Sequence, residues 1–184
     1  MHIAIIGTGK VGSALAKKWA NAGHHIHLGV RDTQNFSGVE LLKEPNTSVH
    51  PVREAVAAAE VILLATPAQA AIQVAQGLGD TTSKVIIDAM NIIRGNGPAG
   101  FTNTADAVLA NTTSEDVVKC FNTVGFNIME NPSFDGTAVD AFVAGDSTKG
   151  KEITSQLALD AGFGACYDVG GNQNFQLMEQ FALF

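Results

Sequence analysis

The chain lacks several features that mark secreted, metal-binding or nucleic-acid-binding proteins. Its 184 residues include only two cysteines, and 11 basic residues are outnumbered by 18 acidic ones, which gives a formal net charge of -7. Cys120 and Cys166 lie far apart and match no metal-site or redox spacing, so we expect buried thiols in a reducing cytoplasm, with a bridge or redox pair as the alternative. The acidic balance argues against general binding to nucleic acid.

Long apolar runs are also absent from the sequence. No segment is long and apolar enough to span a membrane. The first residues enter a predicted strand directly, so we expect no signal peptide. Hydrophobic residues make up 46% of the chain, which suffices for a globular core, and the length indicates one domain or one with a small appendage. We therefore expect a cytoplasmic protein without a membrane partner.

The most informative feature that is present is a glycine-rich motif at the N-terminus. Residues 3–6 form a short apolar run, which is typical of a strand buried on both faces. Behind the motif, apolar residues recur every four positions, which indicates a helix, and Gly23 stands where a left-handed cap would end it. Between strand and helix, the pattern G-x-G-x-x-G comprises Gly7, Thr8, Gly9, Lys10, Val11 and Gly12.

Each glycine of this motif has an expected task. Gly7 allows the tight turn, Gly9 lets a pyrophosphate approach the backbone, and Gly12 lets the helix pack close to the strand. The free N–H groups and the dipole at the helix N-terminus would then hold the phosphates. A motif placed between a strand and a helix predicts a dinucleotide site that all six motif residues help to form. An ordinary glycine-rich turn is the alternative.

The end of the second predicted strand, residues 25–28, indicates which dinucleotide binds. In NAD-binding folds an acidic residue at this tip accepts hydrogen bonds from the adenosine ribose. Here Gly29 would leave room for a 2′-phosphate, Arg31 could pair with that phosphate, and Thr33 could add a hydroxyl. The pattern predicts NADP. NAD becomes plausible if Asp32 faces the ribose, and Arg31 as a solvated loop charge is the other alternative.

Two histidines, His25 and His27, share one face of that strand. At this spacing they could bind a metal, but no third ligand lies nearby in the sequence. We therefore expect a half-exposed strand face and no metal site.

Strand and helix patterns alternate along the rest of the chain. Predicted strands cover 48–50, 60–65, 84–88, 117–122, 141–145 and 165–169, and predicted helices cover 36–44, 51–59, 68–78, 104–110, about 149–162 and 172–184. This alternation implies an α/β fold with a doubly wound, mainly parallel Rossmann sheet in a single domain over residues 1–184. The last third, about 115–184, would complete the sheet and add a C-terminal helix, without a separate helical substrate domain.

Three stretches follow predicted strands where the nicotinamide end of the cofactor should lie. They are residues 66–67, 88–91 and 122–124. Asparagine side chains there can both donate and accept hydrogen bonds, and Met90 and Val124 are apolar enough to lie against a planar acceptor. No catalytic residue is certain, but we expect the hydride site near Thr66, Pro67, Asn91 and Asn122. Further cofactor contacts are expected from Ala65, Thr66, Pro67, Ala89 and Asn91.

Two alternatives concern this region. The asparagines and Asp88 could merely cap strand ends and turns. Residues 92–100 are the most flexible stretch by composition, and they could form a lid or substrate loop or a plain surface loop.

Together these residues resemble the family of NADP oxidoreductases that includes the NADPH-dependent reductases of coenzyme F420, a deazaflavin. The chain is also similar to the reductase domains of membrane metalloreductases. The matching stretches span nearly the whole chain and are 5–12, 28–32, 65–67, 85–91, 118–125 and 142–146. Lys10 departs from the asparagine of the family pattern.

The resemblance implies an NADPH-dependent oxidoreductase that passes hydride to or from a flavin or deazaflavin. Such a transfer needs stacking and alignment, with little protein acid–base chemistry. The three stretches carry no His, Tyr or Cys placed as an evident proton donor, which a carbonyl reductase would usually need. The implied partner is a small-molecule hydride acceptor, with any proton coming from water. A non-catalytic NADP-binding sensor or partner-binding module is the alternative, and a metalloreductase component is a third possibility.

The C-terminal stretch is strongly apolar. Its repeated side chains are too hydrophobic to leave in water, so they close either the domain's own core or a contact with a second copy. The small size and the family resemblance favour a homodimer. The residues concerned are Phe175, Met178, Phe181 and Phe184.

Overall fold

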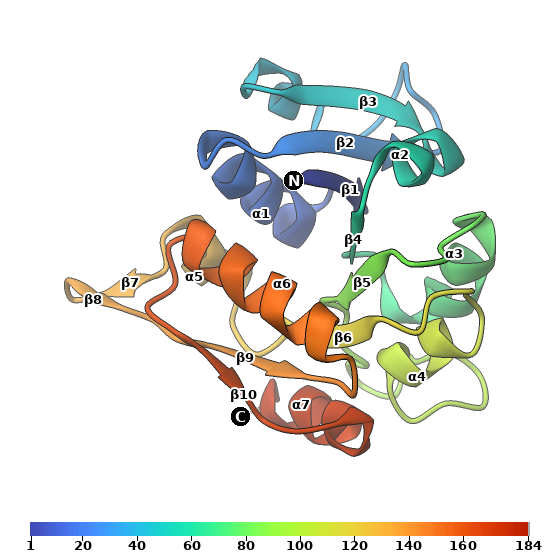
Figure 1. The fold of residues 1–184 in the computed structure, drawn as a ribbon, viewed down its shortest axis with the longest axis vertical. Coiled ribbons are helices and arrows are strands. Elements are labelled where there is room, and N and C mark those ends of the chain that lie inside the picture. The colour runs from blue at the N-terminus through green and yellow to red at the C-terminus, as the bar shows by residue number, and fades with distance from the viewer. Residues whose placement is uncertain (184) are drawn as a thin grey trace.

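A computed structural model describes residues 1–183, so the predicted role of Phe184 lies outside the described residues. The main strands are β1 (His2–Ile6), β2 (His25–Val30), β3 (Thr47–Pro51), β4 (Val61–Leu64), β5 (Val85–Asp88), β6 (Val117–Cys120), β9 (Ala141–Ala144) and β10 (Cys166–Asp168). In the described residues they form an eight-stranded sheet with the order β10-β9-β6-β5-β4-β1-β2-β3 (Figure 1). The strands β3, β2, β1, β4, β5 and β6, in this order across the sheet, are parallel to one another. Strand β9 pairs antiparallel with β6 and parallel with β10. This is the expected Rossmann-like, mainly parallel sheet.

Helices cover both faces of the sheet. The helices are α1 (Lys10–Asn21), α2 (Val52–Ala58), α3 (Ala71–Gly77), α4 (Thr104–Leu109), α5 (Phe126–Glu130), α6 (Thr148–Asp160) and α7 (Phe175–Phe181). One core cluster joins α1, α5 and α6 to the sheet, and the other joins α2, α3, α4 and α7 to the opposite face. The buried Trp19 links α1 to α6, because its indole N–H donates to Leu157 O at 2.8 Å.

The predicted strands all form within two residues of their expected bounds, and most predicted helices form as well. The predicted helix 36–44 is wrong in type and length, since only the 3-10 helix η1 (Val39–Lys43) forms there. Gly38 precedes it with φ +88°, a left-handed conformation that ends any helix running through residue 38. The sequence patterns also missed α5 and the hairpin of β7 (Ser133–Phe134) and β8 (Thr137–Ala138), which projects at the left of Figure 1.

Four histidines gather where β1, β2 and β3 lie side by side. Nδ1 of His2 is 3.0 Å from Nε2 of His27, and the imidazole of His2 stacks on that of His25 with 4.6 Å between ring centroids. We call His2, His25, His27 and His50 the histidine cluster. Burial lowers the pKa of His27, and the positive charge that His50, His2 and His25 would carry lowers it further. Within residues 1–183, no group of three or more metal-ligating side chains has an arrangement that could hold a metal ion.

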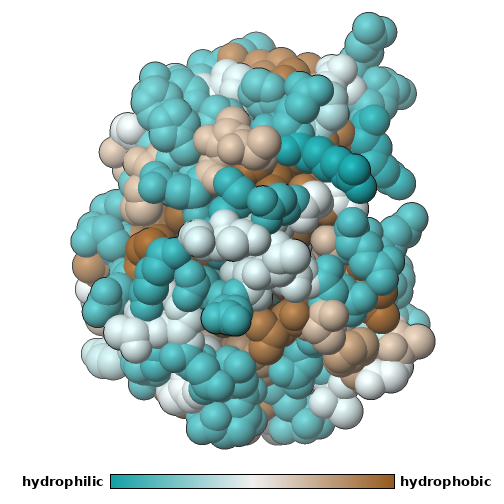
Figure 2. All heavy atoms as spheres, turned by 45° about the vertical axis from the view of Figure 1, so that its right-hand side comes forward, coloured by the Kyte–Doolittle hydropathy of each residue, from teal (hydrophilic) through white to brown (hydrophobic). Residues whose placement is uncertain are grey.

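The two cysteines are both free, Cys120 in the core and Cys166 partly buried. Burial raises the pKa of the Cys120 thiol, as is typical of an unreactive structural cysteine. None of the helices in residues 1–183 has the length and apolar character that a membrane crossing needs. The side of the molecule shown in Figure 2 is mostly hydrophilic, with hydrophobic residues exposed in small separate patches.

Candidate active site

The glycine-rich motif forms a tight turn between β1 and α1. Gly7 has φ +105°, and a Cβ there would lie 2.5 Å from the carbonyl oxygen of Ala65. A Cβ on Gly12 would overlap the carbonyl oxygen of Gly7, so the helix can approach the strand only with glycine at this position. Around Gly9, by contrast, a Cβ would meet nothing within 4 Å. The turn is therefore closed on the protein side and open at Gly9, which fits a pyrophosphate, while the side chain of Val11 packs against the core.

The N-terminus of α1 presents free backbone donors at this turn. Gly9 is the N-cap residue, and in the described structure no side chain accepts a hydrogen bond from the first turn. Ser13 N–H donates to Gly9 O at 2.8 Å, and the Ser13 hydroxyl donates to Thr8 O at 3.1 Å. The Lys10 ammonium lies 4.6 Å from the ring centroid of Phe126, so this cation is directed toward α5.

Gly29 has a different role from the one that we expected. It is buried one residue before the end of β2, and a Cβ there would clash with the Ile6 side chain and lie 3.2 Å from Ala55 Cβ. Glycine is therefore required by packing against α2 and not by room for a 2′-phosphate. The residue at the strand tip is Val30, which is also neutral, so the absence of an acidic side chain at the tip still holds.

The loop after β2 carries the other residues expected at the adenine end. Arg31 and Thr33 are both exposed, and the ion pairs of the described residues do not include Arg31. Asp32 instead folds back on its own loop, where its Oδ1 accepts hydrogen bonds from Gln34 N at 2.9 Å and Asn35 N at 3.2 Å. This turn occupies Asp32 Oδ1 and leaves the guanidinium of Arg31 as the free charged group.

The same loop returns to the glycine-rich turn. The hydroxyl oxygens of Thr8 and Ser37 are 3.3 Å apart, and a Cβ on Gly38 would lie 3.1 Å from Thr8 O. The structure thus brings the loop that begins at Arg31 against the predicted phosphate turn.

Residues that follow β4 lie beside this turn, and residues that follow β5 lie next to the end of β4. Ala65 is partly buried next to Gly7, and Ala89 is buried at the end of β5. The Thr66 hydroxyl donates to Met90 Sδ at 3.2 Å. Met90 is only 3% exposed and packs into the core, so the expectation that its side chain lies against an acceptor ring is wrong.

Asn91 and Asn122 form a reciprocal pair across the ends of β5 and β6. Asn91 Nδ2 donates to Asn122 O at 2.7 Å, and Asn122 Nδ2 donates to Asn91 Oδ1 at 2.9 Å and to Met178 O at 2.9 Å. Both neighbours of the Asn122 amide nitrogen are acceptors, which fixes the orientation of this side chain. Its Oδ1 is buried without a hydrogen-bond partner among the described residues, and such an atom needs a donor from outside.

Phe121 turns the backbone directly before Asn122. Its φ of +65° is a left-handed conformation that bulky residues rarely adopt. The ring is held between Trp19 and Phe163, each with its ring centroid 5.8 Å away. Core packing therefore imposes the backbone conformation that positions the Asn122 side chain.

A pocket opens beside these strand ends. Its volume is about 350 Å³, and it lies between the segment after β4 and the loop after β5. The lining residues are Pro67, Ala68, Gln69, Asn91, Ile93, Arg94 and Asn96. The structure thus brings two of the four residues expected at the hydride site, Pro67 and Asn91, together with residues of the loop 92–100, which was expected to be either a lid or substrate loop or a plain surface loop. Val124 is partly buried against the core and does not line this pocket.

A buried charge cluster adjoins the peptide that precedes Asn91, and sequence reasoning missed most of it. Lys119 is fully buried, and its Nζ lies 2.8 Å from Asp88 Oδ2 and 2.8 Å from Glu179 Oε1. Burial favours the neutral form of Glu179, but the Lys119 ammonium and the backbone donors Thr104 and Ile92 outweigh it and lower the pKa. The available signal was a lysine inside the apolar run of β6, because a buried ammonium needs partners.

Comparison with known proteins indicates the family that this chain resembles. Residues 2–92 match the family described as NADP oxidoreductase, coenzyme F420-dependent. The chain is similar to this family over its N-terminal half. It is an NAD(P)-dependent oxidoreductase with NADP(H) as the cofactor. The match covers β1 to β5, which carry the glycine-rich turn, Arg31 and the Thr66 and Asn91 stretches.

Relatives extend the similarity over the whole chain. The F420-dependent NADP reductase of Methanothermobacter thermautotrophicus is 26% identical over 98% of this chain and 85% of its own. The crystal structure of a putative F420-dependent NADP reductase from Arthrobacter sp. FB24 has a TM-score of 0.84 at 24% identity, covering 98% of this chain and 90% of the other. A reductive aminase from Aspergillus terreus has a TM-score of 0.71 at 16% identity, and the chain spans only 59% of that protein. The two structural similarities show the fold alone.

Proposed function

We propose that this oxidoreductase transfers hydride between NADP(H) and a flavin or deazaflavin acceptor of the F420 type. The observation that carries the proposal is the pocket beside Thr66 and Asn91. Its described lining consists of amides, apolar side chains and Arg94, without a His, Tyr, Cys, Lys or carboxylate. Hydride transfer between two ring systems needs alignment and not a protein acid, whereas carbonyl reduction usually uses a positioned proton donor. The F420-dependent NADP reductase among the relatives supports the same acceptor class.

In this proposal the phosphate turn and the loop after β2 hold the adenine half of the cofactor. The open backbone at Gly9 accepts the pyrophosphate, and Arg31 and Thr33 bind the 2′-phosphate. The remaining motif residues and Ala65 shape the turn. Bound NADPH supplies the hydride, which reduces the acceptor ring, and the accompanying proton comes from water.

The nicotinamide end lies by Thr66, Pro67 and Asn91 in this proposal, with Ala89 beneath it. Asn122 Oδ1 is the buried acceptor that still needs a donor, and the reciprocal bond between Asn91 and Asn122 holds both side chains in place. These residues align the two rings and exclude water, and none is proposed to transfer a proton.

Turnover assays with flavins and deazaflavins test this function. Thr66→Leu and Asn122→Leu should stop NADPH oxidation with every active acceptor, because the added bulk blocks ring alignment, while calorimetry should still detect NADP binding. Thr137→Leu, on the exposed hairpin strand β8, is the matched control and should behave like the wild-type protein. Unchanged turnover in both site variants would show that hydride transfer takes place at another site. Binding of NADP without turnover by any acceptor would favour a non-catalytic sensor.

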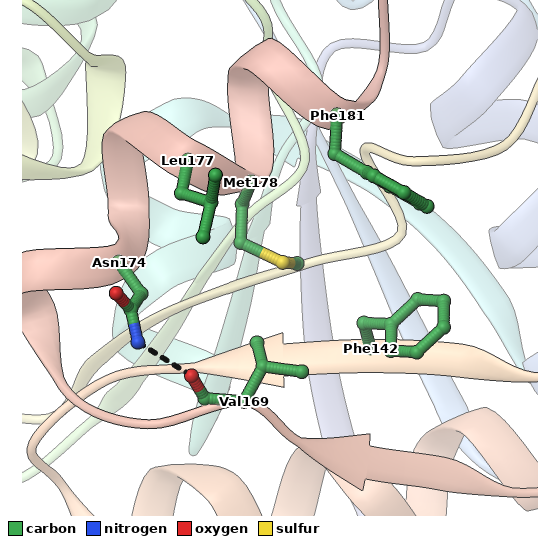
Figure 3. Close-up of a pocket in the computed structure, with 6 residues that line it drawn as sticks. All are labelled: Phe142, Val169, Asn174, Leu177, Met178 and Phe181. Atoms are coloured by element: carbon green, nitrogen blue, oxygen red, sulfur yellow. Dashed lines mark hydrogen bonds between the residues drawn. The ribbon is translucent and has the colours of Figure 1, made fainter. Parts of the chain in front are cut away.

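We also propose that the chain forms a homodimer through α7. Phe175 and Met178 are buried and close the domain's own core, but Leu177 and Phe181 are 60% and 55% exposed. They border an apolar cavity of about 190 Å³ between α7 and strand β9 (Figure 3). The neighbouring strand β10 is an unpaired sheet edge in the described structure, which is a common docking surface for a second copy. Sedimentation that gives only monomer at micromolar concentration would refute this.

A cytoplasmic location is part of the same proposal. It is supported by the two free cysteines, since thiols persist in a reducing compartment.

A further inference from the structure

The loop of residues 92–103 forms one wall of the candidate pocket. It connects the end of the Asn91 stretch to α4 and contributes Ile93, Arg94 and Asn96 to the lining. Its own backbone hydrogen bonds are short-range, such as Asn96 N–H to Ile93 O at 3.1 Å and Gly97 N–H to Gly95 O at 3.0 Å. These bonds shape the tip of the loop, but they do not fix the tip relative to the sheet.

Both ends of this loop are held by one carboxylate from the C-terminal helix. Ile92 N–H donates to Glu179 Oε2 at 2.8 Å, and Thr104 N–H donates to Glu179 Oε1 at 2.8 Å. The two amides lie 87 and 75 residues from Glu179 in the sequence, and they mark the first residue of the loop and the first residue after it. A single side chain of α7 therefore closes the base of the loop.

A buried cation balances the charge of this carboxylate. Glu179 is 4% exposed, and the Lys119 ammonium lies 2.8 Å from its Oε1. Lys119 also donates to the Thr104 hydroxyl at 2.9 Å. A carboxylate that is buried, paired and hydrogen-bonded on both oxygens is held in one geometry, because loss of any partner would leave a desolvated charge.

The same cluster fixes the peptide that leads to Asn91. Lys119 Nζ donates to Met90 O at 2.8 Å, while Met90 N–H donates to Asp88 Oδ1 at 2.9 Å. Asn91 follows directly and lines the pocket. The buried cluster thus supports two walls of the pocket, the asparagine stretch from below and the loop at its base.

We propose that Glu179 is the positioning residue of the acceptor side of the site: it clamps residues 92–103 in the arrangement that holds the acceptor against the nicotinamide. The inference rests on the proposed function for the identity of the acceptor. It goes further by assigning to the C-terminal helix a role in acceptor alignment and none in nucleotide binding. The glycine-rich turn and Arg31 belong to other elements, and among the described residues they are not hydrogen-bond or ion-pair partners of Glu179.

Two substitutions separate clamping from simple stabilisation. Glu179→Gln keeps the shape of the side chain but replaces one acceptor oxygen by a donor, so it cannot hold both amides and Lys119. Glu179→Asp keeps the charge for Lys119 but is one methylene too short to reach Ile92 and Thr104 together. In both variants we expect faster amide hydrogen exchange confined to residues 92–104 and turnover lower by about 10–100-fold, with unchanged Kd for NADP. Glu152→Gln, an exposed glutamate on α6, is the matched control.

The outcomes are distinguishable. Wild-type loop exchange and acceptor kinetics in both folded variants would overturn the proposal, as would a loss of NADP affinity equal to the loss of turnover. If Glu179→Gln does not fold, amide hydrogen exchange in the wild-type protein tests the proposal instead. The clamp predicts slower exchange at Ile92 and Thr104 than at the tip residues 93–96, and equal exchange rates would overturn it. If no flavin or deazaflavin supports turnover, the proposed function fails, while exchange measurements with NADP bound still test the clamp.

Discussion

Replacing Arg31 with alanine is expected to weaken the binding of NADP(H) far more than the binding of NAD(H). Arg31 directly follows the last residue of β2, and its guanidinium takes part in none of the ion pairs of residues 1–183. The nearest carboxylate in sequence, Asp32, is engaged by Gln34 N–H at 2.9 Å through Oδ1. The cation is therefore available for a 2′-phosphate, which is present in NADP and absent from NAD.

The magnitude follows from the exposure of the arginine. A charge-assisted, often bidentate contact with a phosphate contributes roughly 1.5–3 kcal/mol. Because Arg31 is exposed, water and salt screen this contact, so the lower part of the range, about 1.5–2 kcal/mol, applies. At 1.4 kcal/mol per factor of ten, the Kd for NADP should rise roughly 10–30-fold.

Calorimetry of wild-type protein and Arg31→Ala with NADP and with NAD measures this difference. Lys149→Ala is the matched control, because it also removes one positive charge. Its ammonium pairs with Asp116 at 2.8 Å and with Ser83 O at 2.7 Å, at the edge of the sheet where β5 and β6 begin, opposite the proposed nucleotide site. Equal losses of affinity for NADP and NAD in Arg31→Ala would show that Arg31 does not read the 2′-phosphate. A comparable loss in the control would show a general charge effect.

Three further predictions address packing, pH and association. Gly12→Ala should lower the free energy of unfolding by about 1–3 kcal/mol, because the new Cβ overlaps Gly7 O; an unchanged melting temperature would contradict this packing. Because the pKa of His27 is lowered in the folded protein, the unfolded chain binds more protons than the folded one as the pH falls below the ordinary value of 6.5. The free energy of unfolding should therefore be greatest above pH 6.5 and decrease below it. Denaturant titrations from pH 8 to pH 5 should show that loss, and His27→Gln should flatten the curve. Phe181→Glu should shift sedimentation toward monomer, and an unaltered dimer would remove α7 from the interface.

The glycine-rich turn illustrates what the sequence predicts well. Its strand, its turn and its helix are consecutive, and the glycines are set by local backbone geometry: Gly7 has φ +105°, and Gly12 has no room for a side chain. The helix end at Gly23, with φ +93°, is equally local. The parallel sheet could also be predicted from the sequence, because strands that alternate with helices pair in parallel and bring their carboxyl ends to one edge.

The wrong predictions for Gly29 and Met90 involve contacts between distant residues, whereas the helix predicted over 36–44 failed for a local reason, the left-handed backbone of Gly38. Gly29 was interpreted from its place at a strand end, yet its size is dictated by Ile6 and Ala55 across the sheet and helix. Met90 looked available to an acceptor because it is apolar, but the fold buries it. Its neighbourhood in sequence contains no sign of which face of the strand end becomes core.

The sequence by itself determined the fold class, the glycine-rich turn and the resemblance to the NADP oxidoreductase family, since each depends on short patterns of apolar residues and glycine. Only the tertiary structure decided how the proposed acceptor side is built. A lysine in an apolar strand indicates that Lys119 needs a buried partner, but the sequence does not show that this partner is Glu179, and their pairing at 2.8 Å appears when the sheet and α7 pack together. Buried charges must find partners, but which partner they find depends on the packing of segments that are far apart in the chain.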